Sequence, residues 1–356
     1  MADYEIRMAN EDDRDRVIGL ISSIYSGDVA ARYDWLYRTN PHGHALTWLA
    51  IERASGDAVG CTSIFPRKVR VAGRERTGSI GGDCYIEPRA RRQGLATALH
   101  RATLAEMRHH GIEFMYGPPT PNNLGALIKA GSHFVTSYKR WVRPLTSQRA
   151  YRAAFSRVPS RFEAHLAEIP IMVLDRLTRM DAKGFRLEQV HEFTTEFDRM
   201  FERASATHTV ACERDRLYMA WRYFELPERR QMPLAVRREG ELVGFVALER
   251  AGECAAVADL FSANDPGLID AILQLVVAHT AAAGCSSLEI SLTKECAIAQ
   301  RLRRHGFIGR DERGFQVAIA GDKSDELQVD NLLAAYSWHF TEADQDMGTV
   351  FVNAPG

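Results

Sequence analysis

The chain has 356 residues, of which 46% are hydrophobic and 26% are charged, and this composition is ordinary for a globular protein. Its 45 Lys and Arg residues nearly balance 46 Asp and Glu residues, so the overall charge excludes the strongly basic class of nucleic-acid-binding proteins. A chain of this length suggests two domains, each large enough to bury a core of its own.

The N-terminal residues 1–7 lack both the basic lead and the apolar core of a secretory signal, and no later segment is apolar enough to span a bilayer. We therefore expect a cytoplasmic protein without membrane contact. The six cysteines lie far apart and form no C-x-x-C pair, which argues against a zinc site and against a disulfide framework. We expect no metal site, and we expect each cysteine to be a small buried apolar residue.

The first predicted elements follow the chain from its N-terminus and alternate between the periods of strand and helix. They are a strand at Tyr4–Arg7, an amphipathic helix at Asp12–Tyr25, and a hairpin of two strands at Ala45–Glu52 and Ala58–Phe65, joined through Gly56 and Asp57. The segment Trp35–Pro41 lies between the helix and the hairpin.

The segment Ile86–Ala96 is typical of a strand end, a tight turn and the opening of a helix, because Leu95, Leu99 and Ala102 then recur at the helical period. The first amides of a helix have no partner within it and carry the positive end of its dipole, so they bind anionic oxygens well. Gly94 leaves room for an anion to approach them.

The motif V/I-x-P-x-x-R-x-x-G-x-G/A, filled here by Ile86, Pro88, Arg91, Gly94 and Ala96, resembles the acetyl-CoA diphosphate loop of the GNAT superfamily of N-acyltransferases. It differs from the dinucleotide fingerprint and from the P-loop. The resemblance implies acetyl-CoA or another acyl-CoA as co-substrate. The residues that it implies for binding CoA are Tyr85, Ile86, Arg91, Arg92, Gln93, Gly94, Leu95, Ala96, Thr97, Asn122 and Asn123.

Acyl transfer from a thioester to an amine needs a group that removes the proton of the amine. Asp83 is the first candidate for this base, because it lies on the strand that leads into the loop, where the strands of GNAT proteins part around the thioester. Glu87 is the second candidate, and a solvated carboxylate at a strand end is an equal interpretation of it.

The position that many GNAT proteins use for the general acid, which protonates the leaving thiolate, has no Tyr in this chain. That Tyr comes from the helix after the next strand, and this chain has Leu127 and Ile128 there. Tyr116 and Tyr85 are possible substitutes, and Cys84 is a weaker one. Each of the three also fits a buried position beside a cleft.

An internal repeat relates the two halves of the chain. Trp221–Pro227 has Trp, Tyr and Pro at the same offsets as Trp35–Pro41. The other predicted elements of the second copy are strands at Phe185–Glu188, Leu234–Arg238, Leu242–Leu248 and Gly284–Ser291 and helices at Thr194–Ala204 and Ile298–Arg304. The sequence thus predicts an α/β fold with a mixed sheet and two tandem GNAT-like domains.

The second copy is predicted to be degenerate. Where the first copy has its basic loop, the second has Phe261–Gly267, whose Asp265 at a helix start would repel a diphosphate. We therefore predict a catalytic, CoA-binding domain at residues 1–145 and a substrate-shaping or structural domain at 184–322. An amphipathic connector at 146–183 would join them, and a tail at 323–356 would pack on the body.

These features favour an N-acyltransferase, most simply an N-acetyltransferase, that acts on a small amine as a monomer or homodimer. The tandem type resembles bacterial acyltransferases of secondary metabolism and of surface-polysaccharide pathways. Two alternatives stay open. A Fem-like transferase would take an aminoacyl group from tRNA, which the arginine-rich connector mildly favours and the intact CoA loop opposes, so that nucleic acid is an unexpected partner. An acyl-CoA sensor would bind the thioester without turnover.

Overall fold

The computed structural model describes residues 3–147, 182–228, 230–321 and 328–346, with four isolated positions (169, 172, 173 and 176) between the first two ranges. Most of the predicted connector lies outside these ranges, including Arg149, Arg152, Arg157 and Arg161. The strand expected at residues 349–352 of the tail also lies outside them.

The front half of the chain has one alternating order of strands and helices. Its elements are β1 (Tyr4–Met8), α1 (Arg14–Ile21), α2 (Val29–Tyr33), β2 (Leu46–Glu52), β3 (Ala58–Val71), β4 (Arg74–Ile86), α3 (Leu95–Glu106), β5 (Phe114–Gly117), α4 (Pro121–Ala130) and β6 (His133–Pro144). The first helix is shorter than its periodicity predicted, because Asn10 forms a capping box with Asp13 and the intervening residues form a 3-10 turn.

The rear half repeats this order with one additional strand, β8, between its first two helices. Its elements are β7 (Phe185–Gln189), α7 (Thr195–Ser205), β8 (Val210–Cys212), α8 (Arg216–Phe224), β9 (Gln231–Arg238), β10 (Glu241–Ala251), β11 (Cys254–Ser262), α9 (Pro266–Ala282), β12 (Ser287–Thr293), α10 (Ala297–Leu302) and β13 (Ile308–Ile319). Two short elements follow, α11 (Val329–Leu333) and β14 (Trp338–His339). Both halves have the strand and helix order predicted from the repeat.

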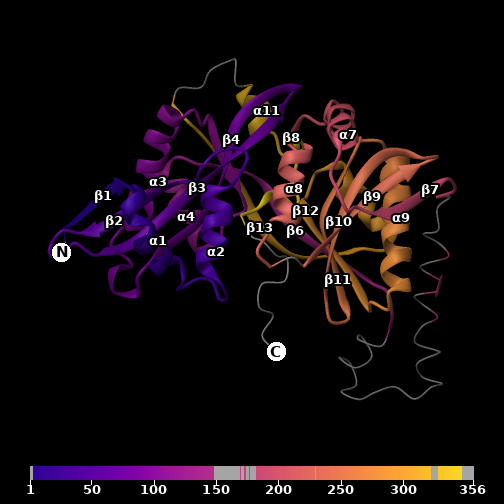
Figure 1. Cartoon of the computed structure of the whole chain (residues 1–356), viewed down its shortest axis with the longest axis horizontal. Helices are drawn as coiled ribbons and strands as arrows, with labels where there is room; N and C mark the ends of the chain where they lie inside the picture. Colours follow the sequence, from indigo (N-terminus) through magenta and orange to yellow (C-terminus); the bar gives the residue numbers. More distant parts are fainter. Residues whose placement is uncertain are drawn as a thin grey trace.

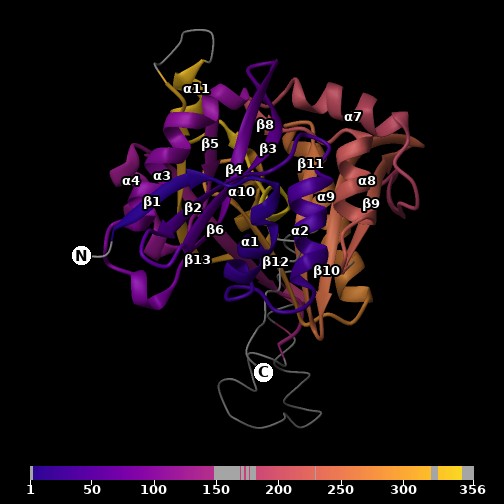
Figure 2. The same ribbon diagram turned by 60° about the vertical axis from the view of Figure 1, so that its left-hand side comes forward.

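Within the described ranges, the strands form one continuous sheet in the order β1-β2-β3-β4-β5-β13-β6-β12-β11-β10-β9-β7, with β8 and β14 attached at β3. Figure 1 shows the two halves side by side with β6 and β13 between them, and in Figure 2 these two strands lie between β1 and β9. None of the described helices is long and apolar enough to cross a membrane.

The halves exchange their last strands. β13 of the rear half pairs antiparallel with β5 of the front half, and β6 of the front half pairs antiparallel with β12 of the rear half. β6 and β13 also pair with each other. Each half therefore completes the sheet of the other, and neither has a free edge at the centre.

The repeated tryptophans meet at the interface between the halves. The rings of Trp35 and Trp221 stack with their centroids 4.5 Å apart, and each Nε1–H donates a hydrogen bond of 3.2 Å to the backbone oxygen of the other residue. Both side chains are buried. The sequence repeat thus corresponds to a pseudo-symmetric contact between the two halves.

The residues after β13 return to the front half. β14 pairs parallel with β8, and the ring of Trp338 lies 4.9 Å from that of Tyr116. Trp338 and Phe340 have no exposed surface, so they are core residues rather than a ligand platform. This path carries residues 341–346 into the front half of the molecule.

We predict that Trp221→Ala lowers the free energy of unfolding by about 3–5 kcal/mol, because it removes a buried ring together with its stacking on Trp35 and its hydrogen bond to the backbone oxygen of Trp35. Urea denaturation measures the change. Leu217→Ala on the same helix is the matched control, since Leu217 is 62% exposed and should change stability by less than about 0.5 kcal/mol. Equal losses in both variants would contradict a central role for the tryptophan pair.

Candidate active site

The loop before α3 exposes backbone amides to an open space. Arg92 and Gly94 both have left-handed backbone conformations, with φ of 62° and 82°, and they turn the chain sharply into the helix. Gly94 is the N-cap and provides no side chain to the amides of the first turn, and a Cβ at Gly94 would meet nothing within 4 Å. A cavity of about 210 Å³ lies over this helix start.

Most of the residues predicted to bind CoA through the loop line this cavity, namely Ile86, Arg91, Arg92, Gly94, Leu95, Ala96 and Thr97. Tyr85 and Gln93 are not part of its lining. Arg91 stiffens the turn, because its Nε donates a hydrogen bond of 2.9 Å to the backbone oxygen of Ile86 and its guanidinium lies over the ring of Tyr85.

At the corresponding helix start in the rear half, the side chain of the N-cap residue is bound to a backbone amide of the first turn. Asp265 is the N-cap of α9, and its Oδ1 accepts a hydrogen bond of 2.7 Å from the amide of Leu268. A carboxylate already occupies the position that an anionic ligand would take at this helix. The two helix starts therefore differ in the way that the sequence comparison predicted.

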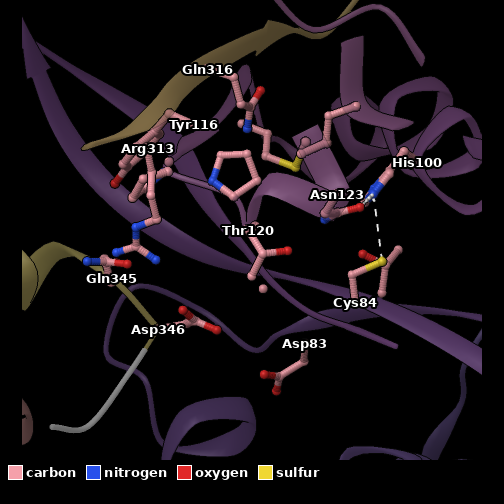
Figure 3. Close-up of a pocket in the computed structure, with 18 of the residues that line it drawn as sticks. Asp83, Cys84, His100, Tyr116, Thr120, Asn123, Arg313, Gln316, Gln345 and Asp346 are labelled. Atoms are coloured by element: carbon pink, nitrogen blue, oxygen red, sulfur yellow. Dashed lines mark hydrogen bonds between the residues drawn. The ribbon is translucent and has the colours of Figure 1, made fainter. Parts of the chain in front are cut away.

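A second cavity, of about 160 Å³, lies where β4 and β5 part (Figure 3). The two strands pair in parallel over Gly78–Ile80 and Phe114–Tyr116 and then separate. The chain continues from β5 into Pro118 and Pro119, which have no N–H to continue a ladder. Both cavities lie along β4 and α3, because Cys84 and His100 line this cavity and Ile86 and Thr97 line the loop cavity.

Asp83 enters this cavity from a bulge in β4, with a left-handed φ of 49°. Tyr25 and Tyr37 donate hydrogen bonds of 2.7 and 2.6 Å to its carboxylate, and Arg32 forms an ion pair of 2.8 Å with it. Burial opposes the charged form, but the Arg32 guanidinium and these hydroxyls hold the pKa of Asp83 below its usual range. This saturated carboxylate is a weak base.

Asp346 lies in the same cavity and comes from the other end of the chain. Its Oδ2 is 3.8 Å from Nη2 of Arg32, and a Cβ on Gly82 of β4 would collide with its carboxylate. Burial, together with the negative charge of Asp83, raises the pKa of Asp346 to about 7. A carboxyl group that titrates near neutral pH suits the removal of a proton from an amine.

The segment that presents Asp346 is held by a turn and a buried ion pair. Thr341 and Asp344 form a capping box around a 3-10 turn. Asp344 also forms a buried ion pair of 2.8 Å with Arg214 of the rear half. The position of Asp346 therefore depends on the rear half of the chain.

The structure argues against two of the catalytic residues predicted from the sequence. Glu87 lines neither cavity and pairs with Arg89 at 2.8 Å, so it matches the alternative of a strand-end carboxylate. Tyr116 contributes to the cavity wall, but its hydroxyl is buried 3.1 Å from Sγ of Cys212. Burial raises the pKa of Tyr116 well above its usual value, and its hydroxyl points into the core rather than toward a ligand.

Cys84, His100 and Asn123 form a partly buried group in the wall of the cavity. His100 Nε2 lies 2.8 Å from Oδ1 of Asn123 and 3.7 Å from Sγ of Cys84. Burial raises the pKa of Cys84 to about 11 and lowers the pKa of His100, so both groups are neutral at pH 7. Asn123 thus lines the cavity, whereas Asn122 is not part of the lining, and contact of either with the CoA arm stays a prediction.

Sequence reasoning missed Asp346 and Arg32. The capping box at Thr341 predicts a local turn, but nothing in the local sequence indicates that the next acidic residue enters a cavity of the front half. Arg32 is one of many arginines in the chain, and nothing in the local sequence distinguishes it. Its burial against Asp83 depends on the packing of α2 over the sheet.

Comparisons with known proteins agree with this geometry. Residues 5–123 match the family described as "Acetyltransferase (GNAT) domain". A search of curated proteins gave no match. The chain thus carries a GNAT acetyltransferase domain in its front half.

Solved structures share the fold over nearly the whole chain. A GCN5-related N-acetyltransferase from Anabaena variabilis has 13% identity and a TM-score of 0.63, with 90% of this chain and 73% of that chain covered. A probable N-acyltransferase from Enterococcus faecalis has 9% identity and a TM-score of 0.65, covering 89% and 73%. N-myristoyltransferase from Saccharomyces cerevisiae, solved with bound myristoyl-CoA, has 12% identity and a TM-score of 0.56, covering 90% and 80%.

We predict that Gly94→Trp abolishes CoA binding while the protein stays folded, because the indole would fill the space over the amides of α3. Isothermal titration calorimetry measures the binding, and the melting temperature checks the fold. Gly111→Trp is the matched control. Gly111 has a φ of 76°, a Cβ placed there would meet nothing within 4 Å, and the residue follows the other end of the same helix. Unchanged CoA affinity in Gly94→Trp would contradict the assignment of the loop.

Proposed function

We propose that the protein is an N-acyltransferase that moves an acyl group from acyl-CoA to the amine of a small molecule. The observation that carries the proposal is the carboxyl group of Asp346, which lies in a cavity at the parting of β4 and β5 and titrates near pH 7. In this proposal the loop before α3 holds the diphosphate. The rest of the CoA molecule passes between β4 and α3, so that the thioester reaches the cavity where β4 and β5 part. The GNAT match of residues 5–123 supports the choice of reaction.

The acceptor enters as an ammonium ion and loses one proton to the Asp346 carboxylate. The neutral nitrogen then attacks the thioester carbon, the C–N bond forms, and the carbon–sulfur bond breaks. CoA leaves as a thiolate and takes up the second proton that the nitrogen loses, so the products are an amide and CoA thiol, with the first proton on Asp346. We assign the base to Asp346 in place of Asp83 and Glu87.

Asp83 and Arg32 act on the base rather than on the substrate in this proposal. The fixed negative charge of Asp83 raises the pKa of Asp346, and Arg32 limits that rise because it lies close to both carboxylates. The two groups therefore set the pH range in which Asp346 accepts a proton.

We also propose a cytoplasmic location, which the cysteines support. All six lie among the described residues and none forms a disulfide bond, at Cys61, Cys84, Cys212, Cys254, Cys285 and Cys296. Free thiols are typical of a reducing compartment, where acyl-CoA would also be available.

Asp346→Asn should lower kcat by about 100-fold or more, because the amide cannot accept the proton. The release of CoA thiol measures turnover, and calorimetry should show unchanged CoA affinity. In the wild type, kcat should rise with pH through about 7, since the active form of Asp346 is the carboxylate, and this rise should vanish in the variant. Glu87→Gln is the control with expected normal turnover.

A normal kcat in Asp346→Asn would remove this residue from the mechanism. Tight binding of acyl-CoA without thiol release for any amine would instead identify a binding module and overturn the proposed reaction.

Two further variants should move the pH profile in opposite directions. Asp83→Asn removes a negative charge and leaves Arg32 close to Asp346, so the pKa of Asp346 should fall and the acidic limb of the kcat profile should shift to lower pH. Arg32→Gln removes the positive charge and should shift the limb to higher pH. Shifts of the same sign in both variants would contradict the electrostatic coupling.

A further inference from the structure

The cavity contains one cation from the rear half that has no carboxylate partner. Arg313 of β13 lines the cavity and is partly buried, and its guanidinium lies 5.6 Å from the centre of the Tyr138 ring. Within the part of the chain that the structure describes, no carboxylate forms an ion pair with it. Figure 3 shows Arg313 on the side of the cavity opposite Asp83.

The acidic residues near Arg313 are bound elsewhere. Asp311 pairs with Arg140 at 2.7 Å, and Glu312 pairs with Lys139 at 3.5 Å. Glu342 accepts the hydroxyl hydrogen of Tyr138, and burial raises the pKa of Glu342, although the positive charge of Arg313 opposes that rise. No described carboxylate forms an ion pair with Arg313, so its guanidinium can pair with an anion from outside the protein.

Two amide side chains lie on the same side of the cavity as Arg313. Gln316, also on β13, is only 2% exposed, and its Oε1 has no hydrogen-bond partner. Gln345 donates a hydrogen bond of 3.3 Å to the hydroxyl of Tyr138 and borders the cavity beside Asp346. A buried amide without a partner costs free energy that a bound polar ligand would recover.

The charges of the cavity favour a ligand with no net charge. When Asp346 is ionised, it and Asp83 carry two negative charges, and Arg32 and Arg313 carry two positive charges. A simple ammonium ion would add an unbalanced positive charge and leave Arg313 without a partner. An ammonium ion with a carboxylate would pair both ends, because a buried charge is stable when it is paired.

We propose that the acceptor is a small amino acid, whose amine faces Asp346 and whose carboxylate is bound by Arg313, with Oε1 of Gln316 as an acceptor for an N–H of the ligand. This inference rests on the proposed N-acyltransferase function and names its substrate class. The cavity of about 160 Å³ suits a small ligand. A guanidinium pairs with a carboxylate through two parallel hydrogen bonds, which gives the orientation that a nucleophilic amine requires.

The test compares matched acceptors. Each α-amino acid is offered with acetyl-CoA beside its carboxamide and its decarboxylated amine, and CoA thiol release gives kcat and KM. In the wild type we expect kcat/KM to be about 10- to 100-fold higher for the amino acid than for either partner. Arg313→Gln should remove this preference, mainly through KM, and Arg313→Lys should restore part of it.

Arg310→Gln is the matched control, because it removes the same charge from an exposed position of β13 outside the cavity and should leave the preference intact. Equal use of all three acceptors by the wild type would overturn the inference and leave the proposed function standing. A preference for an aminoalkylphosphonate over the corresponding amino acid would also overturn it, because it would identify a phosphate-type ligand.

A binding measurement separates the inference from turnover. Amino acids are titrated into the complex of the protein with CoA, and binding should be weaker in Arg313→Gln than in the wild type and in Arg310→Gln. Absence of thiol release with every acceptor would overturn the proposed function. Absence of amino-acid binding to the CoA complex would overturn the inference.

Discussion

The exchange of β6 and β13 is the constraint on which the rest of this structure depends. Each strand leaves the half of the chain that precedes it and completes the sheet of the other half, so the backbone hydrogen bonds of both sheets are satisfied only when the halves are together. The stacked tryptophans Trp35 and Trp221 then fix the halves at a second point. The two repeats thus share one continuous sheet.

The same exchange builds the candidate active site. Because β13 lies beside β5, its side chains Arg313 and Gln316 border a cavity whose other wall comes from β4. The chain after β13 then passes over the front half, where the pair of Asp344 with Arg214 holds the turn that presents Asp346. The rear half lacks an open helix start. In the proposed function it contributes Asp346 as the base and Arg313 as the cation, and it shapes the acceptor site.

The two helix starts of the repeats differ in their N-cap residue. Gly94 leaves the amides before α3 open, whereas Asp265 closes the equivalent amides before α9 with its own carboxylate. The cavity between β4 and β5 adds a second asymmetry, because Asp83 is held by Arg32 and two tyrosine hydroxyls and Asp346 is left to titrate near pH 7. Local chemistry therefore decides which helix start is open, and long-range packing decides which carboxylate has a raised pKa.

The sequence by itself determined the local features. The helical and strand periods predicted the repeated order of elements. The motif from Ile86 to Ala96 predicted the open helix start, and Asp265 predicted its closed counterpart. Each of these features depends on residues that are close together in the sequence. Only the tertiary structure decided the strand exchange, the burial of Asp83 against Arg32, and the position of Asp346 and Arg313 in one cavity. These features join residues that lie far apart in the sequence, and their energies come from burial and charge pairing that no local pattern records.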